Sequence, residues 1–337
     1  MIRLAVVLWL ALLSPQDAGK GAARFLSEKE AADAIVDESM EPYFSLLRPL
    51  EMQAKTGSPV PGADLAAQRD ECRKRYRAAV REFTEDEKTA MTATAESIGK
   101  ALKEAYPFFA AKPWVFLKID SAIEGGMPHT RGASIVVPSK MAGAFAAVRA
   151  RGADPAKSRL AQTLIHEMCH VLQRAHPDLF ADLYGNVWGL VRAKGIPSDP
   201  WLDKVQIVNP DGPDVGWVFP VKDRFWQPLV VLKDGVERPV MPRDFLFVGV
   251  AREKKGDTFA VRLKDGKPET TLLKDIPEYA EAFKGSFANF HPNETFAELF
   301  AAMAMKDHIA DPGPPAIDHA VLRDWCRKHF ATAPEKK

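Results

Sequence analysis

Two histidines with the spacing of a metal-binding pair lie near the middle of the chain, in the run HEMCH from His166 to His170. On a helix, residues four apart lie about 40° apart around the axis and about 6 Å along it, so both imidazoles can reach one ion. Imidazole nitrogen is a favoured ligand of Zn²⁺. Glu167, beside the first histidine, is placed to hold and deprotonate a water molecule on that ion. The pattern therefore predicts a zinc site.

The residues around this run predict a buried helix that positions it. Asp154 and Pro155 form a helix start, with Asp at the N-cap and Pro at the first helical position. Apolar residues follow with helical spacing to about residue 175, where His176 and Pro177 end the pattern. Histidine and glutamate without partners are costly on a buried helix, which favours a metal site over a pair of surface histidines.

A hydrolytic zinc site needs a third protein ligand, and the sequence offers two candidates. Glu294 lies in a predicted helix over 293–306, with Glu298 one turn later on the same face, where it could accept the N–H of a ligating histidine. His176 has the spacing of the extended HExxHxxGxxH motif, but Gln173 stands where that motif has glycine. If the helix continues, His176 lies about 120° off the face of His170 and about 9 Å along the axis. We therefore expect Glu294 to be the ligand.

Together these residues resemble the zincin metallopeptidases, and specifically their gluzincin branch, in which a Glu on a later helix completes the HExxH site. The resemblance implies that His166, His170 and Glu294 bind zinc. It implies that Glu167 is the general base, and that Glu298 orients a ligating histidine by accepting its N–H.

The resemblance covers about residues 114–177 and 291–305, and it implies a fold and an oxyanion partner as well. The implied fold class is α+β, with a zincin-like core in which a small mixed sheet lies with its edge strand over the active-site helix. Residues 130–137 resemble that edge strand, which pairs with an extended substrate. Gluzincins often stabilise the oxyanion with Tyr or His, which makes Tyr279 and His291 the catalytic candidates.

The composition excludes several classes of protein. The 337 residues carry 46 Lys and Arg against 45 Asp and Glu, a net charge of +1, which gives no support for nucleic-acid binding or a polybasic membrane surface. The contents of 46% hydrophobic and 27% charged residues are those of a globular protein. Three cysteines, Cys72, Cys169 and Cys326, are too few for a disulfide framework.

Residues 1–23 have the features of a signal peptide. Arg3 gives a positive start, and an apolar run of roughly ten residues follows, too short to span a bilayer. Cleavage after Ala18 or Ala23 would release the mature chain. We therefore expect an exported protein, secreted or in the periplasm or cell envelope, with no stable membrane insertion after signal removal.

The remaining chain divides into four predicted parts. Residues 24–110 are expected to be an N-terminal helical region, and 111–195 a zincin core with the HExxH helix. Residues 196–275 contain short β-rich runs separated by Asp-Gly and Gly-Asp turns, which predict an inserted antiparallel β meander. Residues 276–337 are expected to be a helical part that carries the third ligand.

The sequence thus indicates an exported zinc-dependent metallopeptidase-like hydrolase that acts on a peptide or protein substrate. Two alternatives stay open. One is a non-proteolytic metal-binding envelope protein with the same fold. The other is a zincin in which His176 is the third ligand.

Overall fold

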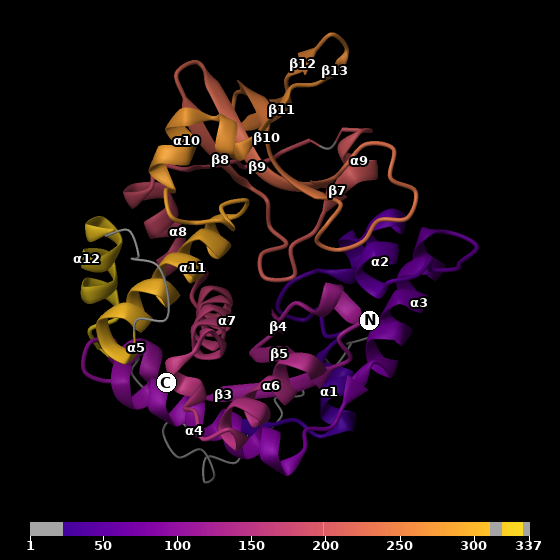
Figure 1. The fold of residues 1–337 in the computed structure, drawn as a ribbon. Helices are drawn as coiled ribbons and strands as arrows, with labels where there is room; N and C mark the ends of the chain where they lie inside the picture. Colours follow the sequence, from indigo (N-terminus) through magenta and orange to yellow (C-terminus); the bar gives the residue numbers. More distant parts are fainter. Residues whose placement is uncertain (1–22, 198, 311–318, 333–337) are drawn as a thin grey trace, which may run out of the picture.

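The computed structural model describes residues 23–197, 199–310 and 319–332, so residues 1–22 of the expected signal peptide lie outside the described residues, whereas Ala23 is the first residue of strand β1. The fold is α+β. Figure 1 shows a seven-stranded sheet at the top, a five-stranded sheet below, and helix α7 (Arg159–Ala175) at the centre. Among the described residues, no helix combines the length and the apolar character needed to cross a membrane.

The five-stranded sheet lies beside α7. Its strand order is β1-β3-β5-β4, with β2 also paired to β3. β1, β3 and β5 are parallel, whereas β4 runs antiparallel to β5 and β2 antiparallel to β3. The strands are β1 (Ala23–Phe25), β2 (Val80–Arg81), β3 (Trp114–Ile119), β4 (His129–Arg131) and β5 (Ser134–Pro138).

Two expectations about this sheet are corrected. Residues 130–137 form a hairpin rather than one strand, because Gly132 takes a φ of 52° and reverses the chain between β4 and β5. β4 is therefore the edge strand and β5 lies inside the sheet. The N-terminal part is not helical alone, since β1 and β2 both pair with β3.

Two helices of the N-terminal half begin at capping boxes, formed by Ser27 with Glu30 and by Thr84 with Glu87. The helices of this half are α1 (Glu28–Ala34), α2 (Pro49–Thr56), α3 (Leu65–Ala78), α4 (Glu85–Leu102), α5 (Pro107–Ala110) and α6 (Ser139–Ala150). The chain enters β2 soon after α3 ends.

The helix with the HExxH run starts one turn later than predicted. Asp154 caps a short 3₁₀ turn, Pro155–Lys157, and Ser158 then caps α7 by accepting a hydrogen bond from the backbone of Leu160. Ten of the residues of α7 are buried, including Glu167 and His170. The predicted buried helix is therefore present.

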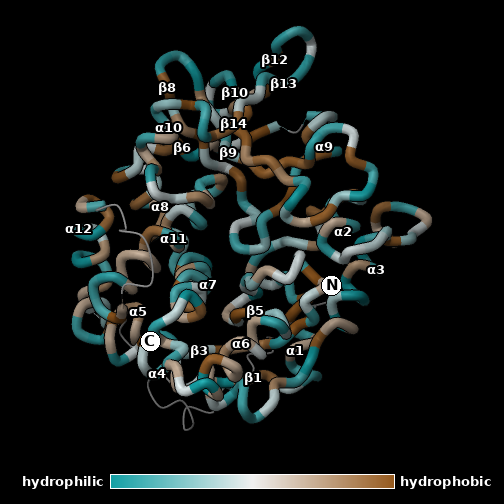
Figure 2. Tube along the Cα trace, viewed as in Figure 1, coloured by the Kyte–Doolittle hydropathy of each residue, from teal (hydrophilic) through white to brown (hydrophobic). Residues whose placement is uncertain are grey.

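The seven-stranded sheet contains the expected meander. Its order is β11-β10-β9-β8-β6, with β14 and β7 paired to β10 and β9, and the pairs are antiparallel. Figure 2 shows hydrophobic residues along β9 and hydrophilic residues at the outer turn between β12 (Leu263–Lys264) and β13 (Lys267–Pro268). The strands are β6 (Val191–Arg192), β7 (Gln206–Ile207), β8 (Trp217–Val221), β9 (Arg224–Leu232), β10 (Phe245–Lys255), β11 (Thr258–Val261) and β14 (Thr270–Leu272).

Helices on either side of this sheet complete the molecule. Between α7 and β6 lie α8 (Pro177–Asp182) and a π-helical turn, Leu183–Val187. α9 (Leu202–Val205) precedes β7. After the sheet come α10 (Pro277–Ala282), α11 (Pro292–Ala304), a π-helical turn over Met305–Ile309 and α12 (Ala320–His329).

α11 packs directly against α7 in the main hydrophobic core. Phe296 and Phe300 of α11 share this core with Leu164, Met168 and Leu172 of α7. Apolar burial of this kind contributes about 1.5–3 kcal/mol for each large side chain. The pairing fixes the face of α11 that carries Glu294 against the face of α7 that carries the two histidines.

Candidate metal centre

The structure brings His166, His170 and Glu294 to one point. The Nε2 atoms of the two histidines are 3.0 Å apart. The carboxylate of Glu294 lies 3.2 Å from Nε2 of His166 through Oε2 and 3.6 Å from Nε2 of His170 through Oε1. The two histidines come from α7 and Glu294 from α11. Glu294 lies 128 positions after His166 and 124 positions after His170.

This triangle of donor atoms fits a zinc ion. Tetrahedral Zn²⁺ with bonds of about 2.0–2.2 Å separates neighbouring ligand atoms by about 3.3–3.5 Å. The three measured separations, from 3.0 to 3.6 Å, bracket that value. Two imidazoles and one carboxylate are also a donor set that catalytic zinc sites use, with the fourth position left for water.

The expected ligand orientation comes from Gln173 rather than from Glu298. Nδ1 of His170 lies 2.8 Å from Oε1 of Gln173, so Nδ1–H donates to the amide and Nε2 presents its lone pair to the metal position. The amide nitrogen of Gln173 donates to Tyr184 Oη and to the backbone oxygen of Asn293, which fixes the direction of the amide. A helical glutamine therefore positions the ligand.

The pKa values of Glu294 and His170 are shifted by burial and by the charges around them. Burial acts to raise the pKa of Glu294, but the neighbouring His170 and His166 hold it well below its ordinary value. Burial likewise acts to lower the pKa of His170, yet the charges of Glu294 and Asp211 raise it to about 10. Metal binding therefore competes with a proton on His170.

Glu167 adjoins the candidate ligand His166 on α7. Its side chain is buried on α7, and its Oε2 atom makes no hydrogen bond to any described residue. Burial, and after it the charge of Asp211, raise the pKa of Glu167 well above its ordinary value. A raised pKa makes this carboxylate a better proton acceptor than an ordinary glutamate.

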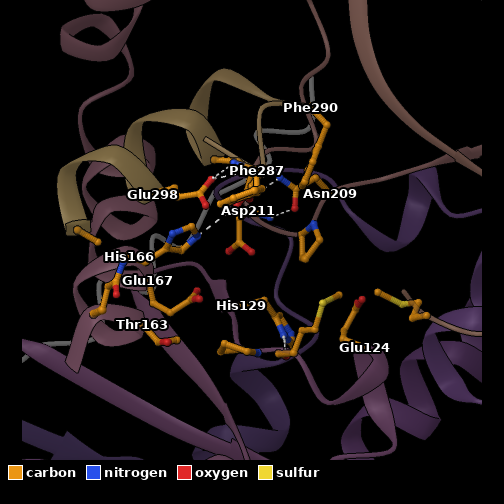
Figure 3. A pocket seen from close by; sticks show the side chains of 18 of the residues that line it. Glu124, His129, Thr163, His166, Glu167, Asn209, Asp211, Phe287, Phe290 and Glu298 are labelled. Carbon is orange, nitrogen blue, oxygen red and sulfur yellow. Dashed lines mark hydrogen bonds and ion pairs between the residues drawn. The ribbon is translucent and has the colours of Figure 1, made fainter. Parts of the chain in front are cut away.

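A cavity of about 550 Å³ opens in front of these residues. Figure 3 shows His166 and Glu167 on one side of it, Glu298 and Phe287 above, and His129 and Glu124 on the far side. Its apolar wall is formed by Met127, Met241, Phe247, Phe287 and Phe290. The candidate centre is thus accessible to a ligand rather than sealed in the core.

A comparison of this chain with protein families, with curated proteins and with solved structures finds no match.

His176, the alternative third ligand, is not at the centre. α7 continues through Gln173 to Ala175, and His176 follows as its C-cap with a φ of −137°. Its Nε2 lies 2.8 Å from Nζ of Lys112, and its ring packs at 4.9 Å from that of Phe108. The helix points this histidine away, as expected from the absence of a glycine turn.

Glu298 has different partners from those expected. Its Oε2 accepts hydrogen bonds from Oγ of Ser286 and from the backbone amides of Phe287 and Ala288, at 2.7–2.9 Å. It accepts no hydrogen bond from a ligating histidine. Glu298 lines the cavity, where it holds the 286–288 loop in place.

Neither oxyanion candidate lies in the cavity. His291 caps α11, with Nδ1 accepting from the amide of Asn293 and Nε2 directed at the backbone oxygen of Asp214. Tyr279 is buried among Phe219 and Phe283, and its hydroxyl donates to a backbone oxygen. Both side chains have structural partners, and their expected catalytic roles stay predictions.

Asn209 and Asp211 belong to the site although the sequence gives no signal for them. Nδ2 of Asn209 donates to Oε1 of Glu294 at 2.7 Å. Asp211 forms a second close group with Glu167 and His170, whose ligand atoms lie within 4.8 Å of one another. The run Asn-Pro-Asp-Gly-Pro from residue 209 has the composition of an ordinary turn, so only the fold reveals its position.

Proposed function

We propose that this protein is a zinc-dependent hydrolase of peptide bonds with a zincin-like active centre. The observation that carries the proposal is the triangle of His166, His170 and Glu294 with zinc-ligand spacing, beside the free carboxylate oxygen of Glu167, at the wall of an open cavity. Structural zinc sites lack an open position and a neighbouring base, whereas hydrolytic sites need both.

The residues divide the chemistry between them. A zinc ion bound to the three ligands would act as a Lewis acid on a substrate carbonyl and make water acidic. Glu167 takes the proton from the attacking water and returns it to the leaving amine. Gln173 and Asn209 keep His170 and Glu294 in position, which lowers the cost of reorganisation during the reaction.

Metal analysis combined with a Glu167→Gln variant tests this proposal. We expect one zinc per chain in both proteins, because Glu167 is not among the three proposed ligands. Hydrolysis of a mixed peptide library, followed by mass spectrometry, should occur with the parent chain and fall by about 10²–10⁴-fold in the variant, the usual contribution of a general base. Zinc binding without any hydrolysis would instead support the non-proteolytic alternative, and absence of zinc would reject both.

Export of the protein is part of the proposal. It rests on the apolar N-terminal run, and the substrate would then be a peptide outside the cytoplasm.

A further inference from the structure

One segment of the chain lies across the cleft that contains the candidate centre. This crossing segment, residues 209–214, connects β7 with β8 and reaches from the seven-stranded sheet toward β4 (Figure 1). Asp211 lines both the cavity in front of His166 and a second cavity of about 600 Å³ beside Gln173 and Arg174. The crossing segment thus divides the space along α7 into two cavities.

The crossing segment occupies the position at which an extended substrate would pair. β4 is the edge strand, and its Thr130 amide donates to Oδ1 of Asp211 at 2.7 Å, while the Thr130 hydroxyl also donates to that oxygen at 2.6 Å. An edge amide that already has a partner cannot add a substrate strand. A peptide chain therefore cannot pass along β4 through both cavities while Asp211 stays in place.

The crossing segment is fixed from several sides. Arg174 donates to the backbone oxygen of Pro210, and the side-chain amide of Asn293 donates through Nδ2 to the backbone oxygen of Asp211 at 2.8 Å. Gly212 packs so closely on His291 that a Cβ there would lie 2.5 Å from the imidazole. These contacts hold the crossing segment in place between the two cavities.

Five carboxylates line the cavity on the side of the centre, together with Arg159. Glu298 is bound to backbone amides, and Glu294 faces the two histidines. Glu124 is neutralised by Lys55 at 3.0 Å. Of the carboxylates that line this cavity, Glu167 and Asp211 face the same open space (Figure 3), within reach of a cationic group, although Oδ1 of Asp211 also accepts from Thr130.

A second, independent feature points to a ligand in this cavity. The His129 ring is buried in the cavity wall, and its Nε2 makes no hydrogen bond to any described residue. Nδ1 lies 3.3 Å from the backbone oxygen of Met127, so Nδ1–H donates there and Nε2 keeps its lone pair. Burial lowers the pKa of His129 to about 4, which keeps the ring neutral. An orphaned acceptor in a mostly apolar wall is suited to accept an N–H group of a bound ligand.

We propose that this cavity binds the free amino end of a peptide with an apolar first side chain, and that the enzyme removes residues one at a time from that end. Asp211 accepts hydrogen bonds from the α-ammonium group, and the first side chain of the peptide contacts the wall that includes Met127 and Phe247. Water adds across the first peptide bond, giving a free amino acid and a peptide shortened by one residue. This inference rests on the proposed function, because it specifies the substrate of the same centre.

Two forms of one peptide test the inference. The zinc-loaded full chain is incubated with a leucine-initiated hexapeptide carrying a free amino end, and with the same peptide acetylated at that end. We expect mass spectrometry to show stepwise loss from the free form and, because the acetyl group removes the cation, a rate at least about 100-fold lower for the acetylated form. Internal cleavage of both forms would overturn the inference and show that the crossing segment moves aside, and loss from the carboxyl end would overturn it as well.

An Asp211→Asn variant separates binding from folding. We expect KM for the free peptide to rise about tenfold or more while kcat changes less, because a charge-assisted hydrogen bond to the substrate is lost. Asp214→Asn is the matched control in the same segment, since the Asp214 side chain pairs with exposed Arg192, and it should leave both constants unchanged.

Binding gives a result that does not depend on hydrolysis. Calorimetric titration of the zinc-loaded chain with leucine amide, and with N-acetyl-leucine amide, should show binding of the first compound alone. If no peptide is cleaved but leucine amide still binds, the proposed function fails and the recognition of an amino end holds. Equal binding of the two compounds, or equal binding of leucine amide by the parent and Asp211→Asn chains, would overturn the inference.

Discussion

Gln173 holds the proposed ligand His170 in position. Its amide accepts from Nδ1 of His170 and is itself held by Tyr184 and Asn293. The sequence indicated only that a glutamine there prevents a glycine turn. The sequence shows which residue stands at this position. It does not predict the rotamer that directs the amide at His170, because that rotamer depends on groups on α11 and on the π-helical turn after α8.

Replacing Gln173 with Ala should weaken zinc binding by about 10–100-fold, because the hydrogen bond that orients His170 is lost while the three ligands remain. Competition with a fluorescent chelator measures the change. Gln53→Ala, a glutamine on α2 far from the centre along the chain, is the control and should leave zinc affinity unchanged. Equal affinity in the Gln173→Ala and parent chains would contradict this role.

The two candidates for the third ligand give a second prediction at the residue scale. Glu294→Ala should leave the purified chain with little zinc, because two histidines alone bind it poorly. His176→Ala should keep one zinc per chain, since this histidine lies against Lys112 and Phe108. Atomic absorption on the dialysed proteins checks both, and the reverse pattern would return His176 to the site.

At the scale of elements, local signals predicted more than long-range contacts did. Turn residues separated the strands of the meander, and capping boxes mark the starts of α1 and α4, since both kinds of signal act within a few residues. Sequence could also pair α7 with α11 through their motif residues. It could not place the crossing segment over β4, because contacts such as Thr130 with Asp211 join positions 81 residues apart and leave no local pattern.

The loop held by Glu298 gives a prediction for an element. Glu298→Ala should free the 286–288 loop, because its carboxylate accepts three hydrogen bonds from that loop. Hydrogen exchange followed by mass spectrometry should show faster exchange at the amides of Phe287 and Ala288, with zinc content unchanged. Glu281→Ala, an exposed glutamate with one weak partner, is the control. Loss of zinc from Glu298→Ala would instead show that Glu298 supports the ligands.

Across the whole molecule, a buried polar cluster joins the N-terminal helices to the insertion. Lys55 on α2 is fully buried and donates to Glu124, to Tyr43 and to the backbone oxygen of Val208, which comes directly before the crossing segment. Glu51 accepts from the amide of Val208. Neither the burial of these charges nor their partners follows from composition, because charged helical residues are usually exposed.

Lys55→Met should lower the free energy of unfolding by about 3–5 kcal/mol, because it leaves the buried carboxylate of Glu124 without its counter-ion. Urea denaturation followed by circular dichroism measures this change. Lys74→Met on α3 is the control: Lys74 is 73% exposed, so its loss should change stability by less than about 1 kcal/mol. A similar small change at both positions would show that the cluster is not a stabilising connection.

The pairing of α7 with α11 has a consequence for the timing of synthesis. Glu294 leaves the ribosome 124 positions after His170, and the whole seven-stranded sheet is made in between. At about 5–20 residues per second, that interval lasts about 6–25 s. During it, the nascent chain contains the two histidines but lacks the carboxylate that completes the proposed zinc site. The proposed zinc site can therefore form only after the seven-stranded sheet has been synthesised.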